Sequence, residues 1–176
     1  MPAARRRASG GQLLVDALVR YGVDHIFTVP GESFLGALDA LRDAQDRIRL
    51  IICRQEGGAA YAAEAFGKLT GRPAACFVTR GPGATNAAIG VHAASQASTP
   101  MLLLVGQVPR HERGTGAFQE VDFEAMFAPL AKHRREVRSA AEISEAFADA
   151  YAAATTPPAG PAVLAFPEDV LQEEAG

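Results

Sequence analysis

Residues 50–71, LIICRQEGGAAYAAEAFGKLTG, decide the fold. The apolar run from Leu50 to Cys53 predicts a buried strand, and a polar corner follows it. The next segment, Gly57 to Thr70, predicts a helix that ends at Gly71. Glu56 therefore lies where the carboxyl end of a strand turns into a helix, the edge at which parallel α/β sheets bind ligands. Since the helix dipole alone also favours an acid in a first turn, this stretch leaves both interpretations of Glu56 open.

The helix after Glu56 is unusually rich in small side chains, namely Ala59, Ala60, Ala62, Ala63 and Ala65. A plain surface helix has no need of so many alanines. We therefore expect a neighbouring element or a flat ligand to approach this helix closely.

Apolar strands and amphipathic helices alternate along the rest of the chain. The expected strands are residues 25–29, 48–53, 73–79, 101–105, 132–138 and 161–166. The expected helices are residues 10–21, 34–44, 57–70, 84–95, 122–127 and 140–154, with Gly22 and Ser33 as caps. Most strands are solid apolar runs, which is typical of a parallel sheet covered on both faces. The fold class is therefore α/β, a doubly wound, mainly parallel six-stranded sheet, with the charged strand 132–138 near an edge.

The bulk composition is that of one soluble globular domain. The chain has 176 residues, of which 48% are hydrophobic, and its net charge is −3. This charge provides no basic field for nucleic acid, and no apolar run is long enough to span a membrane. We expect residues 1–9 to be a disordered basic leader, residues 10–171 to be the domain, and residues 172–176 to begin a linker or tail.

Two kinds of side chain limit the metal and redox chemistry. Cys53 and Cys76 lie in expected buried strands without CxxC spacing, which indicates reduced core thiols in a cytoplasmic protein. The four histidines have no metal-ligand spacing, so we expect no metal site built by this chain alone.

Three corners follow expected strands: Val29-Pro30-Gly31, Arg54-Gln55-Glu56 and Arg80-Gly81-Pro82-Gly83. We expect the third corner to be a tight turn. In a doubly wound sheet such corners meet at one edge. Their glycines let the backbone touch a ligand, although turn chemistry alone also explains them. The long loop at residues 106–120 reaches the same edge.

Other site classes have weaker support. A dinucleotide site would need a third glycine where Asn86 stands and a ribose-binding acid after the next strand. The segment at Gly67-Lys68 lacks the other residues of a P-loop, and neither Ser95 nor Ser98 lies in a nucleophile elbow. A nucleotide-binding module therefore remains as a poor alternative.

Several motifs in order carry a family resemblance: VPGES at 29–33, RQEGGAAYAAEAFGKLTG at 54–71, TRGPGATN at 79–86, TPMLLLVGQVP at 99–109, GAFQE at 116–120, KH at 132–133 and GPAVLAFPEDV at 160–170. Over about residues 10–171 the chain resembles the N-terminal pyrimidine-binding domain of thiamine diphosphate-dependent enzymes, in the acetolactate synthase-like branch. The resemblance implies a transferase or lyase that acts on 2-oxo acids by decarboxylation and carboligation.

The same resemblance implies roles for individual residues. Glu56 matches the catalytic glutamate that hydrogen-bonds the aminopyrimidine ring nitrogen and so activates the cofactor. The cofactor-binding positions are Pro30, Gly31, Glu56, Gly81, Pro82, Gly83 and Asn86. Phe118 and Gln119 match positions that face the substrate, although Phe118 would serve equally well as a loop anchor.

The chain also departs from the family pattern. The family usually has Arg-His-Glu-Gln where this chain has Arg54-Gln55-Glu56-Gly57. It usually has serine at Arg80 and commonly aspartate near Gln96. Arg80 adds a bulky cation beside the pyrimidine site, which leaves the specific reaction open.

The family's diphosphate and Mg²⁺ site, a Gly-Asp-Gly stretch followed by asparagine, has no match in this sequence. We therefore expect this chain to form half of an active site and to be inactive alone. A diphosphate-binding domain, in cis or in trans, would complete the site. The 176 residues then belong to a larger enzyme or to a subunit of a split 2-oxo acid decarboxylase. A non-catalytic assembly or binding module is the alternative. In either case we expect a homo-oligomer, because the two small-residue helices, 57–70 and 84–95, would pair between copies.

Overall fold

The structure, a computed structural model, describes residues 7–175. The strands are β1 (Ala8–Ser9), β2 (His25–Thr28), β3 (Arg49–Ile52), β4 (Ala75–Thr79), β5 (Met101–Gln107), β6 (His133–Glu136), β7 (Pro161–Pro167) and β8 (Glu174–Ala175). The α-helices are α1 (Gly10–Arg20), α2 (Leu35–Arg42), α3 (Glu56–Thr70), α4 (Arg80–Ala97), α5 (Phe123–Met126), α6 (Ile143–Thr155) and α7 (Glu168–Gln172). Three 3₁₀ turns are η1 (Glu32–Phe34), η2 (Arg110–Glu112) and η3 (Ala140–Glu142).

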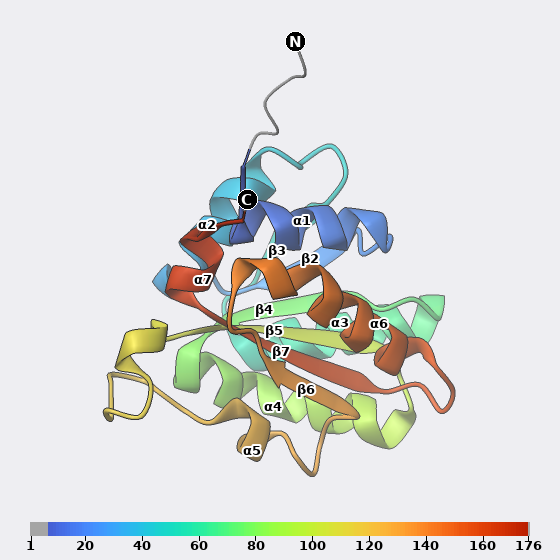
Figure 1. Cartoon of the computed structure of the whole chain (residues 1–176). Coiled ribbons are helices and arrows are strands. Elements are labelled where there is room, and N and C mark those ends of the chain that lie inside the picture. Colours follow the sequence, from blue (N-terminus) through green and yellow to red (C-terminus); the bar gives the residue numbers. More distant parts are fainter. Residues whose placement is uncertain (1–6, 176) are drawn as a thin grey trace.

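Six strands form one sheet in the order β3-β2-β4-β5-β7-β6, and every neighbouring pair is parallel. Helices α1, α2, α6 and α7 cover one face, while α3, α4 and α5 cover the other (Figure 1). This arrangement confirms the expected doubly wound α/β fold. The chain runs from β2 outward to β3 and returns to β4 beside β2, so the topological switch point lies between β2 and β4.

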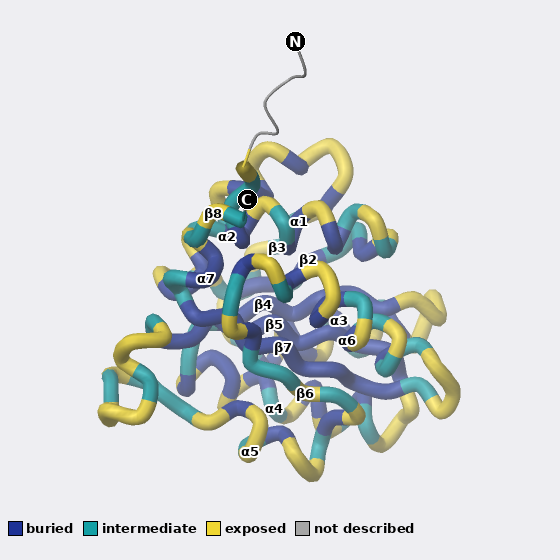
Figure 2. Tube along the Cα trace, in the orientation of Figure 1, coloured by how far each residue is buried: buried dark blue, intermediate teal, exposed yellow. Residues whose placement is uncertain are grey.

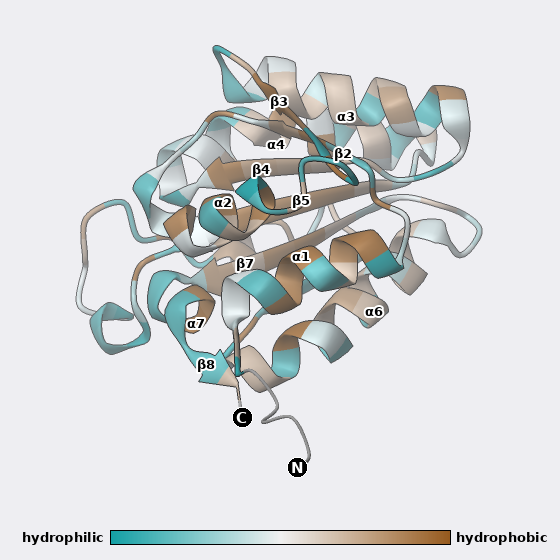
Figure 3. Ribbon diagram, turned by 90° about the horizontal axis from the view of Figure 1, so that it is seen from above, coloured by the Kyte–Doolittle hydropathy of each residue, from teal (hydrophilic) through white to brown (hydrophobic). Residues whose placement is uncertain are grey.

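Each face of the sheet has its own apolar core, because successive side chains of a strand point to opposite faces. Phe77 and Leu104 pack under α1, α2 and α6, whereas Val78 and Leu103 pack under α3 and α4. The central strands β4, β5 and β7 are almost entirely buried (Figure 2), and they are also the most apolar segments in Figure 3.

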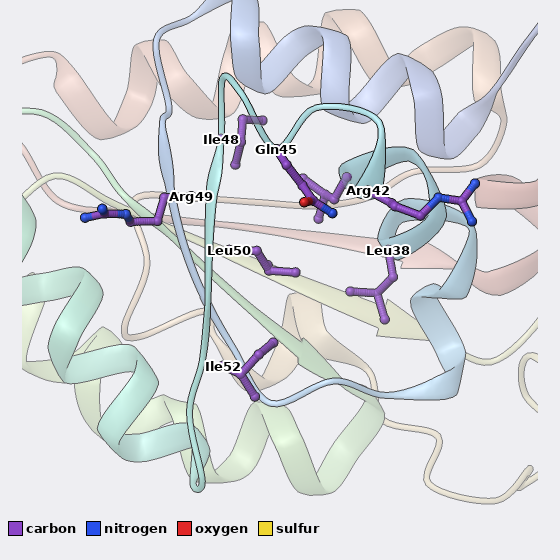
Figure 4. A pocket seen from close by; sticks show the side chains of 8 residues that line it. Leu38, Arg42, Gln45, Ile48, Arg49, Leu50 and Ile52 are labelled. Carbon is purple, nitrogen blue, oxygen red and sulfur yellow. The ribbon is translucent and has the colours of Figure 1, made fainter.

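The strand expected at residues 50–53 is present as β3, but the prediction that it is buried is wrong. β3 pairs only with β2, at the edge of the sheet, and Ile52 is 59% exposed. Cys53 follows the strand and is half-buried rather than a core thiol. One side of β3 borders an open groove of about 460 Å³ against α2, into which Leu38, Leu50 and Ile52 project (Figure 4). An edge strand has neighbours on one side only, so its apolar side chains stay partly exposed.

Two local predictions also need correction. Residues 80–83 are not a separate tight turn but the first turn of α4. Pro82 is tolerated there because the amide of a first-turn residue has no intrahelical acceptor. Ser33 does not cap a helix through its side chain; it lies inside η1, and α2 begins after it without a side-chain cap.

Other local predictions are confirmed. Gly71 ends α3 in the left-handed conformation, with φ +70°, and Gly22 follows α1 with φ +69°. β6 lies at the other edge of the sheet, as its charged sequence predicts.

Residues 8 and 9, expected in the leader, form β1 and pair antiparallel with β8, so the two ends of the described chain meet. Residues 1–6 and 176 lie outside the described residues. No helix of the part that is described has both the length and the apolar character needed to cross a membrane.

Candidate functional site

The carboxylate of Glu56 is held in place by a neighbouring helix. Glu56 is the first residue of α3, and Gln55 caps that helix because its side-chain oxygen accepts a hydrogen bond from the Gly58 amide at 2.9 Å. The side-chain amide of Asn86, on α4, donates to Oε2 of Glu56 at 2.9 Å. The other carboxylate oxygen, Oε1, has no hydrogen-bond partner among residues 7–175, and Glu56 is only half-buried. One oxygen is therefore fixed and the other is open to a donor or acceptor from outside.

Close packing of α3 and α4 sets this geometry. A Cβ added at Gly90 would lie 2.5 Å from Cβ of Ala60, so the two helix backbones approach as closely as small residues permit. Ala59, Ala60 and Ala63 are fully buried in the core shared with α4. The neighbour that the alanine-rich sequence predicts is therefore α4 of the same chain, and this alanine face is not free to pair with a second copy.

The β2 and β4 corners meet at the switch point. A Cβ at Gly31 would lie 2.4 Å from Cβ of Thr79, and the hydroxyls of Ser33 and Thr79 are 2.7 Å apart. A Cβ at Gly106, near the end of β5, would lie 2.2 Å from Oγ of Ser33. Ser33 and Thr79 thus join three strand ends. The sequence did not predict this role, because the contact joins a 3₁₀ turn to the end of a strand 46 residues away.

The long loop after β5 joins the same edge. The amide of Gly81 donates to the carbonyl oxygen of Gln119 at 2.9 Å, and Gln119 adopts φ +67°. Glu120 anchors the loop by accepting hydrogen bonds from the amides of Gly114 and Ala117. Phe118, next to this anchor, is 77% exposed, so its ring faces outward rather than packing on the domain.

The expected site residues therefore fall into two connected groups. Glu56 and Asn86 form the first group. Gly31, Gly81 and the Gln119 backbone form the second, and Pro82 and Gly83 lie between the groups in the first turn of α4. Pro30 is exposed beside Gly31, and Phe118, the residue before Gln119, is exposed as well. Within residues 7–175, no three His, Cys, Asp or Glu side chains cluster closely enough to hold a metal ion.

Known proteins resemble the chain across this site. A family model described as "Thiamine pyrophosphate enzyme, N-terminal TPP binding domain" matches residues 8–126, which include the corners of β2, β3 and β4 and the loop after β5. The chain belongs to this family. The matched region of this thiamine pyrophosphate (thiamine diphosphate) domain includes Gly31, Glu56, Gly81 and Asn86.

Relatives of this thiamine diphosphate domain narrow the branch. The acetolactate synthase large subunit of Parasynechococcus marenigrum is 40% identical over 173 residues, which are 97% of this chain and 28% of the relative. The acetolactate synthase of Bacillus subtilis is 40% identical over 164 residues, 93% of this chain and 28% of the relative. A probable acetolactate synthase large subunit of Methanocaldococcus jannaschii is 39% identical over 165 residues, which are 94% of this chain and 28% of the relative. The chain therefore spans little more than a quarter of the length of these relatives.

Proposed function

We propose that this domain supplies the pyrimidine-binding half of the active site of a thiamine diphosphate enzyme that acts on 2-oxo acids, by decarboxylation and carboligation as in an acetolactate synthase. The observation that carries the proposal is the Glu56–Asn86 hydrogen bond. It leaves one oxygen of a half-buried carboxylate open at a helix N-terminus.

These residues fit an aminopyrimidine. When bound, thiamine diphosphate would supply an acidic thiazolium carbon whose deprotonated form is a nucleophile toward 2-oxo acids. Oxygen Oε1 of Glu56 would share a proton with the ring nitrogen, which favours the tautomer whose exocyclic nitrogen is a base. Asn86 would hold the carboxylate in the orientation required for that proton.

The glycines would let the backbone line the ring. Gly31 is half-buried and Gly81 is buried, and each has packed neighbours where a Cβ would stand, so only backbone atoms could face the ring at these positions. We assign Pro30, Pro82 and Gly83 to the same wall. Phe118 and Gln119, on the loop that binds Gly81, would face the reacting substrate.

The diphosphate and Mg²⁺ would be held elsewhere. These relatives are more than three times as long as the matched region, and they are acetolactate synthases or large subunits of that enzyme. We propose that a diphosphate-binding domain, in cis or in trans, covers Glu56 and completes the site. Two free thiols, Cys53 and Cys76, fit a reducing compartment, and we place the protein in the cytoplasm.

The decisive experiment is Glu56→Gln in the complete enzyme that contains this domain. The amide keeps the shape but cannot share a proton, so the rate of deuterium exchange at the thiazolium carbon should fall at least about 100-fold. Glu64→Gln, on the same helix and bonded to Thr99, is the control and should leave the exchange rate unchanged. Undiminished exchange in Glu56→Gln would end the assignment.

An assembly module remains the second candidate. The observation in its favour is exposed apolar surface beside the α3–α4 contact, where Tyr61 is 45% and Ile89 is 53% exposed. Such surface favours association, and we propose a homo-oligomer in either case. Sedimentation that shows a clean monomer at high concentration would contradict self-association of this chain.

A further inference from the structure

Arg80 stands at the corner where α4 begins, but its charge is already paired inside the chain. Its Nη2 lies 3.2 Å from Oε2 of Glu168, and its Nη1 lies 3.5 Å from Oε1 of Glu32. The side chain is only 11% exposed. A guanidinium withdrawn from water to this extent needs such partners, so Arg80 is not a free cation awaiting an anionic substrate.

The backbone of Arg80 is held in an unfavourable conformation. Its φ is +43°, in the left-handed region that residues with a Cβ rarely adopt, so surrounding contacts must offset the conformational cost. The next amide, that of Gly81, binds the Gln119 carbonyl, and Asn86 on the same helix binds Glu56. The strained residue is therefore the starting point of the turn that orients both groups of the candidate site.

The other end of the ion pair is firmly anchored. Glu168 is the first residue of α7, and that helix is fixed independently of Arg80. Nε of Arg110 lies 2.7 Å from Oδ2 of Asp169, and its Nη2 lies 2.9 Å from Oε2 of Glu173. Because α7 has its own attachment, Glu168 can act as a fixed point for Arg80.

We propose that Arg80 is a positioning residue: the Arg80–Glu168 pair braces the left-handed corner of α4 against α7 and so holds Gly81 and Asn86 in register with Gln119 and Glu56. The relevance of this ion pair to catalysis rests on the proposed function of Glu56, but the test of the ion pair does not. The pair joins positions 88 residues apart in the sequence. Arg80, which stands where the family usually has serine, thus has a structural role in this chain.

The test uses the ¹⁵N-labelled chain without cofactor, as Glu168→Gln, Arg80→Gln and the double variant. Backbone amide exchange is followed at Gly81 and at the core strand residue Leu103, and the side-chain amide of Asn86 by its chemical shift. Glu145→Gln, which weakens an ion pair between α6 and Arg135 of β6, is the matched control.

The brace predicts that each single variant raises Gly81 exchange about tenfold and moves the Asn86 signal, while Leu103 and the control stay within about twofold of the parent. The double variant should raise Gly81 exchange no further than Arg80→Gln does alone, because the interaction with Glu168 is already lost in that variant. Equally faster amide exchange at Leu103 would mean that the pair only stabilises the fold as a whole. Unchanged amide exchange at Gly81 would mean that the pair does not hold the start of α4 in place. Either result overturns the proposal without bearing on Glu56→Gln in the complete enzyme.

Discussion

Glu120 is the residue that holds the loop after β5 in one shape. Its carboxylate accepts hydrogen bonds from the amide of Gly114 at 2.6 Å and of Ala117 at 3.3 Å, and it pairs with the guanidinium of Arg113. The Gly114 hydrogen bond lowers the pKa of Glu120 most; burial opposes this, and the Ala117 amide and Arg113 add to the lowering. The loop that carries Phe118 and Gln119 therefore depends on an ionised carboxylate.

This dependence predicts a loosening of the loop in acid. Because the folded pKa of Glu120 is lowered, the stabilisation is fully present above the ordinary value of 4.5 and is lost as the pH falls below it. The amide chemical shifts of Gly114 and Ala117, followed from pH 7 to pH 3, should move toward those of a free loop. Glu120→Gln should show the loosened shifts already at pH 7. Shifts that stay constant to pH 3 in the parent would contradict the prediction.

The two thiols should differ sharply in reactivity. Cys76 is fully buried in β4, and burial raises the pKa of its thiol, with Cys53 and Glu56 adding in the same direction. Cys53 is half-buried, one residue beyond the edge strand. A maleimide should therefore label Cys53 in the native chain and Cys76 only after unfolding, since the thiolate is the nucleophile. Mass spectrometry of the digested protein identifies which cysteine carries the maleimide. Labelling of Cys76 in the native chain as early as Cys53 would contradict the prediction and show that the core around β4 opens readily.

At the scale of elements, the contact between α3 and α4 matters most for the site. Glu56 and Asn86 lie on different helices, so their hydrogen bond exists only while the helix spacing is set by Ala60 and Gly90. A wider spacing would separate the carboxylate from the amide that orients it.

Gly90→Ala should therefore lower the free energy of unfolding by about 1–3 kcal/mol, because its Cβ would lie 2.5 Å from Ala60 Cβ and 2.7 Å from the Ala60 carbonyl carbon. Gly58→Ala in α3 is the control: its Cβ meets nothing within 4 Å, so a gain of about 0.5–1 kcal/mol in helix propensity should appear. Urea unfolding followed by circular dichroism measures both. If Gly90→Ala instead raised the free energy of unfolding, α3 and α4 would have space for a methyl group at this contact.

At the scale of the whole molecule, the candidate site lies on an open edge rather than in an enclosed cavity. Asn86, Pro82 and Phe118 are exposed, and the groove of Figure 4 is lined by other residues, from α2, β3 and the loop between them. A cofactor on this edge would keep one face in water. This openness agrees with the proposal that a second domain closes the site.

The chain alone should accordingly bind thiamine diphosphate and Mg²⁺ too weakly to give heat in a calorimetric titration at micromolar protein. Small-molecule sites usually bury most of the ligand surface, and this edge buries one side at most. Addition of a diphosphate-binding domain should restore the heat, and Glu56→Gln should reduce it. Tight binding by the chain alone, lost in Glu56→Gln, would mean that these residues build a whole site.

Much of the architecture follows from local sequence. The solid apolar runs of β4, β5 and β7, the stop at Gly71 and the charged edge strand β6 each reflect a periodicity or a backbone preference that one segment expresses alone. The proximity of the corners at Gly31 and Gly81 also follows, since parallel strands end at one edge.

Only the tertiary structure decided the rest, because it depends on partners far away in the chain. An apolar run cannot reveal that β3 has a neighbour on one side only, nor that Ser33 bonds Thr79 rather than capping a helix. From the sequence, Arg80 is a bulky cation beside a cofactor site. In the structure it forms an internal ion pair with Glu168. Strand order and long-range pairing decide these points, because an edge position and the neutralisation of a charge are properties of the neighbours and not of the residue.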